Sequence, residues 1–137
     1  MALSKHIMPL SFLAHMANDG SELLVPTLLP VIAHDFSLSY SQIGVLGGAM
    51  IIAIGLGQTF MGYLSDLTGR RITFVSFGLC LLSVGLLGIS VSKSYEQLIF
   101  FNLIAGLGCS VYHPVGVSTI SEMFKDDRKG RALGIHG

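Results

Sequence analysis

Near the start of the chain, four polar side chains recur at helical spacing within an otherwise apolar run: His15, Asn18, Asp19 and Glu22. At about 100° per residue, positions i, i+3, i+4 and i+7 lie on one face of a helix. Inside a membrane, an ionisable stripe of this kind is a candidate for proton transfer or for binding a solute. The alternative is that these groups pair with donors on a neighbouring helix and only fix its packing.

The two carboxylates of the stripe differ in their expected depth. Each acidic group at the centre of a membrane helix costs on the order of 2.5 to 3.5 kcal/mol, so both should face protein or water instead of lipid. Asp19 is the preferred proton site, because Glu22 is expected nearer the outer surface. Beyond Glu22, Pro26 and Pro30 remove backbone donors and predict a bend in this helix.

A second polar group occurs late in the chain, where Asn102 and His113 interrupt the apolar segment 98–121. His113 could exchange a proton or donate a hydrogen bond to a solute, although a histidine satisfied within the core is an equal alternative. Pro114 removes a backbone donor and so leaves the carbonyl of Ser110 available. No second histidine or carboxylate accompanies His113 at the spacing of metal ligands, so no metal site is predicted.

Helices that cross a membrane must position these side chains, because the composition is too apolar for a soluble domain. Of 137 residues, 51% are apolar and only 12% are charged, and the mean hydropathy is +0.70. A helix needs about 20 apolar residues to cross a bilayer. Four segments meet this length, namely 7–33, 43–64, 72–91 and 98–121, and a fifth helix is expected to start near residue 131.

Other classes of function find no support in the residues. Eight basic and eight acidic side chains give zero net charge, so the chain lacks the basic face that nucleic acid requires. Cys80 and Cys109 lie in separate apolar segments, at no spacing typical of a disulfide framework or a zinc site. Because no nucleophile and base pair or phosphate loop occurs either, neither an enzyme nor a cofactor is predicted.

The basic residues predict the orientation of the spans. Short connections force neighbouring helices to run antiparallel, so successive loops alternate between the two sides. Only Lys93 falls on one side, whereas seven basic residues fall on the other: Lys5, Arg70, Arg71, Lys125, Arg128, Lys129 and Arg131. By the positive-inside rule, the sequence predicts a multi-pass protein of the cell (inner or plasma) membrane with a cytoplasmic N-terminus.

The second predicted span is rich in glycine and contains a GxxxG pair, Gly44 and Gly48. Small residues at this spacing let two helices pack backbone to backbone in a membrane. This face therefore permits a close helix contact without requiring one. Such contacts occur both in helices that rock against each other and in static bundles.

The loop between the second and third predicted spans reads GYLSDLTGRR. Glycine permits the tight reversal, an acidic residue is favoured near the start of the next helix, and the arginines mark the cytoplasmic side. The loop resembles the GxLaDrxGRR/K signature of the major facilitator superfamily, although Leu67 stands where that family has a basic residue. The matching positions are Gly62, Leu64, Asp66, Gly69, Arg70 and Arg71.

Three further stretches are similar to one branch of that superfamily, the fosmidomycin-resistance-like exporters. They read HMANDGSELLVPTLLP in the first span, GLGCSVYHPVG in the fourth, and GRALGIHG at the end. Many antiporters of the superfamily carry an arginine in the fourth helix where this chain has Asn102. An arginine-based scheme of proton coupling is therefore not expected here.

The resemblance implies an all-α membrane protein. Residues 1–137 would form an incomplete N-terminal transmembrane half, about four and a half helices of a twelve-helix transporter, and would need the missing C-terminal half as a partner. By this resemblance Gly62, Asp66, Gly69, Arg70 and Arg71 form a cytoplasmic gate. The solute cavity near the middle of the bilayer would be lined by His15, Asn18, Asp19, Glu22, Asn102 and His113.

The leading hypothesis is a secondary active transporter that couples protons to efflux of a small organic solute or drug. Proton-coupled uptake of a metabolite is an alternative, because the sequence does not determine direction. A third reading, from another class, is a truncated membrane protein that transports nothing.

Overall fold

The computed structural model describes residues 2–124, 129–131, 133 and 134, apart from the side chains of residues 2–8 and 123. Within this part of the chain every regular element is a helix, which confirms the predicted all-α class. The main helices are α1 (Ala2–Glu22), α2 (Leu24–Asp35), α3 (Tyr40–Thr68), α4 (Arg71–Val91), α5 (Tyr95–Cys109) and α6 (Tyr112–Met123).

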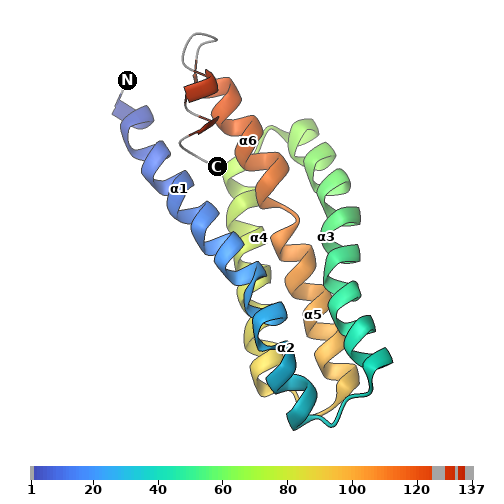
Figure 1. Ribbon diagram of the computed structural model, residues 1–137. Coiled ribbons are helices and arrows are strands. Elements are labelled where there is room, and N and C mark those ends of the chain that lie inside the picture. Colours follow the sequence, from blue (N-terminus) through green and yellow to red (C-terminus); the bar gives the residue numbers. More distant parts are fainter. Residues whose placement is uncertain (1, 125–128, 132, 135–137) are drawn as a thin grey trace.

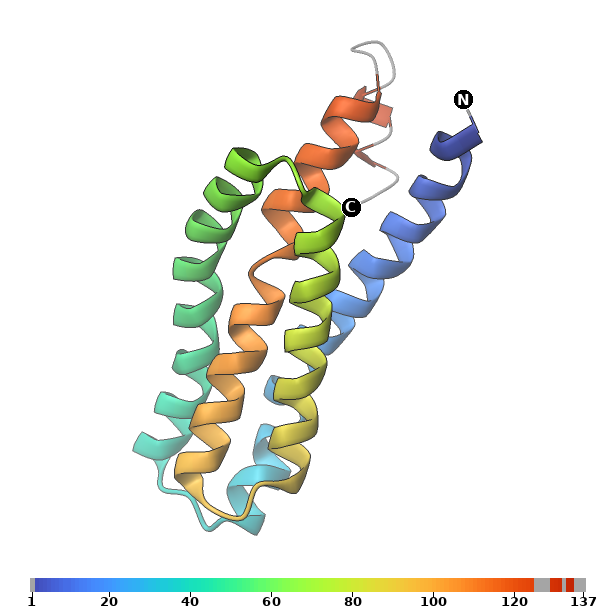
Figure 2. The same ribbon diagram turned by 180° about the vertical axis from the view of Figure 1, so that it is seen from behind.

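The helices form an elongated bundle whose successive spans run antiparallel (Figure 1). α1 continues into α2 on one side, and α5 with α6 runs between α3 and α4, as the view from behind also shows (Figure 2). The start of α1, the α3–α4 connection and the end of α6 lie at one end of the bundle. The described basic residue at the opposite end is Lys93, in the α4–α5 connection. Which end faces the cytoplasm stays a prediction.

Three helical segments among the described residues are long and apolar enough to cross a membrane. They are Tyr40–Thr68, Arg71–Val91, and α5 and α6 taken together as Tyr95–Glu122. Their outer faces carry apolar side chains, such as Leu56, which is 72% exposed and suits contact with lipid. The predicted span 7–33 is not among the three. The structure divides it into α1, which carries the row of polar side chains, and α2, which has only 12 residues.

The fifth helix predicted to start near residue 131 falls in a stretch where the structure describes only 129–131, 133 and 134. These few positions are helical. The rest of that predicted helix lies outside the described residues, as do Lys125 and Arg128. The fifth helix therefore stays a prediction.

Proline explains both interruptions in the bundle. A proline has no backbone N–H, so the carbonyl four residues earlier loses its helical donor. Pro26 affects Glu22 in this way, at the end of α1, and Pro114 affects Ser110, just after the end of α5. The sequence predicted a bend in the first segment, and the structure puts the break at Leu23.

Local signals set the two ends of α3. At its start, Ser39 and Gln42 form a capping box: Ser39 N donates to Gln42 Oε1 at 2.9 Å, and Gln42 N donates to Ser39 Oγ at 3.3 Å. At its end, Gly69 has a φ of 64°, the left-handed conformation that glycine adopts without strain. Gly69 therefore makes the tight reversal before α4 that the sequence predicted.

Glycine brings α4 and α5 into backbone contact. A Cβ added at Gly85 would lie 2.5 Å from Ala105 N, and one added at Gly108 would lie 2.2 Å from Leu82 N. Both distances are far below normal contact, so no side chain fits at either position without moving a helix backbone. Leu82, Ala105 and Cys109 form the buried core along this contact.

The face that carries Gly44 and Gly48 makes no close helix contact within the described part of the chain, so its partner stays a prediction. Among the described residues, no neighbouring atom lies within 4 Å of a Cβ built at either glycine. α3 approaches α5 instead at Gly57, where an added Cβ would lie 2.3 Å from Ser110 Oγ. The spacing of the two glycines shows that this helix face lacks protruding side chains. It does not show which helix packs against that face.

Candidate functional site

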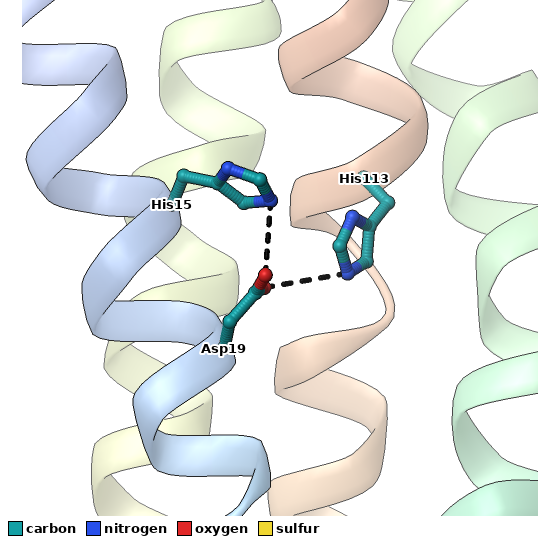
Figure 3. Close-up of side chains that lie close together, drawn as sticks. All are labelled: His15, Asp19 and His113. Carbon is teal, nitrogen blue, oxygen red and sulfur yellow. Dashed lines mark ion pairs between the residues drawn. The ribbon is translucent and has the colours of Figure 1, made fainter. Parts of the chain in front are cut away.

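The carboxylate of Asp19 lies between two imidazoles, and both rings point toward it (Figure 3). His15 Nε2, from the preceding turn of α1, is 3.1 Å from Asp19 Oδ2. His113 Nε2, from the first turn of α6, is 3.5 Å from Asp19 Oδ1. The two rings meet edge to face with centroids 5.5 Å apart. The fold thus brings three predicted site residues together, and we call them the His–Asp–His cluster.

Two features of the helices place this cluster. His15 and Asp19 are four residues apart and therefore share one face of α1. The break after α5 starts a new helix just before His113, so its ring reaches toward α1 (Figure 3). The exposed fractions of the side chains of His15, Asp19 and His113 are 16%, 45% and 37%. The cluster is therefore paired within the bundle and still accessible from one side.

A second set of polar contacts joins α1 to the end of α5. Asn18 Nδ2 donates to Asp19 Oδ1 at 3.2 Å and to Cys109 Sγ at 3.3 Å. Cys109 Sγ in turn donates to Glu22 Oε2 at 3.2 Å. Asn18 and Cys109 are fully buried, and Glu22 is partly exposed. The sequence analysis treated Cys109 as a plain apolar-segment residue and so missed its contacts with the polar stripe.

Tyr112 is a further member of the site that the sequence analysis did not single out. Its ring stacks on His15 with centroids 5.3 Å apart and an angle of 15° between the planes. Its hydroxyl donates to the carbonyl oxygen of Ser11, so it also joins α6 to α1. A buried tyrosine hydroxyl usually finds a partner, and a tyrosine next to His113 in an apolar segment was the available signal.

Asn102 is placed apart from the cluster, between α5 and α3. It is fully buried, and its Nδ2 donates to the carbonyl oxygen of Leu46 at 2.6 Å. Its Oδ1 has no hydrogen-bond partner among the described residues. This hydrogen bond links α5 to α3. That Asn102 lines a solute cavity stays a prediction.

The loop motif joins three helix ends. Arg71, at the start of α4, contacts Asp66 near the end of α3, with Nη2 3.3 Å from Oδ1. The Nη1 atom of Arg71 also forms an ion pair with Glu122 at the end of α6. Arg70 is exposed, whereas Gly62 lies close to α6. The sequence analysis did not predict Glu122, although an acidic residue at the same end of the fourth span was the signal.

The absence of a metal site was predicted only from spacing along the chain near His113. In space, one ligand atom from each member of the His–Asp–His cluster lies within 4.8 Å of the others. Among the described residues, this set has the residue types and proximity to hold a cation. Spacing along the chain could not reveal this set, because two of its members come from α1 and are remote from His113 in sequence.

Comparison with known proteins identifies the family. The model of the Major Facilitator Superfamily matches residues 10–137. The chain belongs to this superfamily. Membership agrees with the three apolar spans and with the loop motif, and it indicates a multi-pass membrane protein.

Several curated relatives of this major facilitator chain are much longer than it is. It is 28% identical to the fosmidomycin resistance protein of Escherichia coli and 25% identical to the uncharacterized MFS-type transporter YfnC of Bacillus subtilis. In both cases the match covers 90% of this chain and 30% of the relative. It is 32% identical to the probable nitrate transporter NarT of Staphylococcus epidermidis, over 83% of this chain and 29% of NarT. No solved structure matches the chain significantly.

The chain thus spans about 30% of the length of these relatives. Proteins outside the fosmidomycin-resistance branch match it to a similar extent, so that branch assignment stays a prediction. The same holds for the solute, the direction of transport and the coupling ion.

Proposed function

We propose that this chain is part of a proton-coupled transporter that exports a small organic solute or drug. The observation that supports this proposal best is the Asp19 carboxylate, held between two imidazoles at the contact of α1 with α6. An ionisable group within a membrane bundle is costly and therefore points to a function. The chain spans about 30% of the length of its relatives, and we propose that a C-terminal half is its partner in the transporter.

The His–Asp–His cluster offers a physical route from a proton to a helix movement. While the carboxylate is ionised, it pairs with His15 on its own helix and with His113 on α6. Protonation of Asp19 removes the negative charge that attracts the two imidazoles, and so weakens the contact between α1 and α6. A proton bound from one side of the membrane thereby favours separation of α1 from α6.

The loop motif would control the other conformational change. Arg71 joins the end of α3 to the end of α6 through Asp66 and Glu122. We assign these ion pairs to a gate at the cytoplasmic end, with Gly62, Gly69 and Arg70 shaping the loop. Opening on this side must break the contacts of Arg71, so the gate stabilises one state of an alternating-access cycle.

Proteoliposomes that carry the complete protein provide the test. Asp19→Asn keeps the shape of the side chain but cannot bind a proton reversibly, so flux driven by a pH gradient should fall to the level of empty vesicles. Solute exchange without a pH gradient should persist. Asp35→Asn is a matched control, since Asp35 also pairs with a histidine, His34, at 3.4 Å but is 62% exposed. Unchanged gradient-driven flux in Asp19→Asn would refute the proton role.

Export is favoured over uptake by the name of one relative, the fosmidomycin resistance protein. The name of the probable nitrate transporter NarT gives a small solute without a direction, so import of a small metabolite is the second candidate. Whole-cell accumulation of a candidate solute separates the two. An uncoupler should raise accumulation if the protein exports and lower it if the protein imports.

A further inference from the structure

We propose that the His–Asp–His cluster is a binding site for a divalent transition-metal cation of the Zn²⁺ type. The proposal rests on three side chains, His15, Asp19 and His113, and on no assumption about transport. Nothing in the sequence motifs or in the names of the relatives suggests a metal at this position.

The chemistry of the three side chains selects the class of cation. Imidazole nitrogen and carboxylate oxygen are both common ligands of Zn²⁺, and zinc sites with three protein ligands leave a fourth position open. Mg²⁺ and Ca²⁺ prefer an all-oxygen shell of six or more ligands, which two histidines and one aspartate do not provide. The set therefore fits a cation with four ligands, of which water or a solute supplies the fourth.

The distances are close to those that such a cation requires. With ligand bonds of about 2.0 to 2.2 Å, tetrahedral ligand atoms lie about 3.3 to 3.6 Å apart. His15 Nε2 lies 3.1 Å from Asp19 Oδ2, and His113 Nε2 lies 3.5 Å from the other carboxylate oxygen, Oδ1, so a carboxylate that binds through one oxygen has to turn toward the second imidazole. All three ligand atoms lie within 4.8 Å of one another, so closing the remaining gap needs a side-chain shift of about 1 Å and no backbone change.

The neighbouring groups already hold the ligands in place. Asn18 donates to Asp19 Oδ1, which orients the carboxylate and leaves Oδ2 directed at His15. Tyr112 stacks on the ring of His15 and limits its rotation. Hydrogen bonds and packing around the ligands usually raise metal affinity. The partial exposure of Asp19 and His113 gives a cation a route into the site.

A bound cation would connect α1 to α6 by ligand bonds where the three side chains alone form ion pairs. Both His15 and Asp19 come from α1, and His113 comes from α6. The helix contact that protonation weakens would then be strengthened by the metal. Zn²⁺ is therefore expected to hold the bundle in the conformation described here.

The experiment uses the 137-residue chain in detergent micelles and titrates it with Co²⁺, followed by displacement with Zn²⁺. Four-coordinate Co²⁺ has intense visible absorption bands, so the spectrum reports geometry as well as affinity. His15→Gln, Asp19→Asn and His113→Gln each remove one ligand. His34→Gln removes a histidine that also pairs with an aspartate but lies on the surface, and it is the matched control. Far-UV circular dichroism verifies that each variant is folded.

The expected result is a four-coordinate Co²⁺ spectrum at one equivalent, with affinity lowered at least about tenfold in each ligand variant and unchanged in the control. Affinity that changes less than about twofold in all three ligand variants would overturn the proposal. So would a spectrum of six-coordinate Co²⁺, or equal loss in His34→Gln. A variant that is unfolded is replaced by Asp19→Glu, which keeps the ligand type and should retain the spectrum. Since no solute or gradient is involved, the outcome does not depend on the transport proposal.

Discussion

Replacing Gly85 with alanine tests the close packing of α4 against α5. The added Cβ would lie 2.5 Å from Ala105 N and 2.7 Å from both its Cα and its Cβ. Carbon atoms in contact normally stay about 3.5 to 4.0 Å apart, so the two helices must separate by about 1 Å. Overpacking of this kind costs about 1 to 3 kcal/mol, and the gain from replacing a helical glycine offsets up to about 1 kcal/mol.

We therefore expect Gly85→Ala to lower the free energy of unfolding by about 1 to 2 kcal/mol. Gly48→Ala is the matched control, because no described neighbour lies within 4 Å of its added Cβ. Without a clash, this substitution should stabilise the helix by up to about 1 kcal/mol. The two identical chemical changes are thus expected to have opposite signs.

Thiol labelling measures both effects on the chain in micelles. Cys109 is fully buried beside the α4–α5 contact, and replacing the exposed Cys80 with serine leaves it as the reporter. The rate at which Cys109 is labelled at increasing denaturant concentration gives the free energy of the unfolding that exposes this thiol. Gly85→Ala should speed the labelling, and Gly48→Ala should leave it unchanged or slow it. Equal rates in the two variants would refute the packing argument.

Three further predictions concern helix ends. Ser39→Ala removes the cap of α3 and should lower the free energy of unfolding by about 1 kcal/mol, whereas Ser41→Ala, an exposed serine in the same helix, should change it little. Pro114→Ala restores a donor for the Ser110 carbonyl, so hydrogen exchange should show a protected amide at position 114 and slower exchange across the break; an unprotected amide would contradict this. Arg71→Gln removes the ion pairs to Asp66 and Glu122, so a thiol introduced at Ser121, next to an intact Glu122, should react faster than in Arg70→Gln, which changes an exposed arginine.

The sequence predicted those parts of the fold that depend on local chemistry. Apolar length and short loops gave three segments that the structure shows as long apolar helices, and the glycine of the loop motif has the backbone conformation that a tight reversal needs. Proline positions predicted a bend in the first segment, because a missing backbone donor acts four residues earlier. These inferences succeed because each cause lies within a few residues of its effect.

Tertiary contacts could not be predicted in the same way. Nothing along the chain indicates that His113 meets Asp19, because this depends on how α6 leaves the break after α5. The pairing of Arg71 with Glu122 likewise depends on the end of α6 lying beside the start of α4. The glycine pair at 44 and 48 could not be assigned a partner from the sequence for the same reason, since the position of neighbouring helices is set by the whole bundle.

The two proline breaks also limit how the bundle can sit in lipid. At each break a backbone carbonyl, at Glu22 and at Ser110, has lost its helical donor. An exposed backbone acceptor costs several kcal/mol in hydrocarbon, so irregular backbone at this depth must be shielded by protein or wetted. Ser110 is fully buried, so the bundle itself shields the break after α5, whereas Glu22 is partly exposed. We therefore expect the side of the bundle that bears Glu22 to face protein or water, and the exposed apolar faces of α3 and α4 to contact the acyl chains.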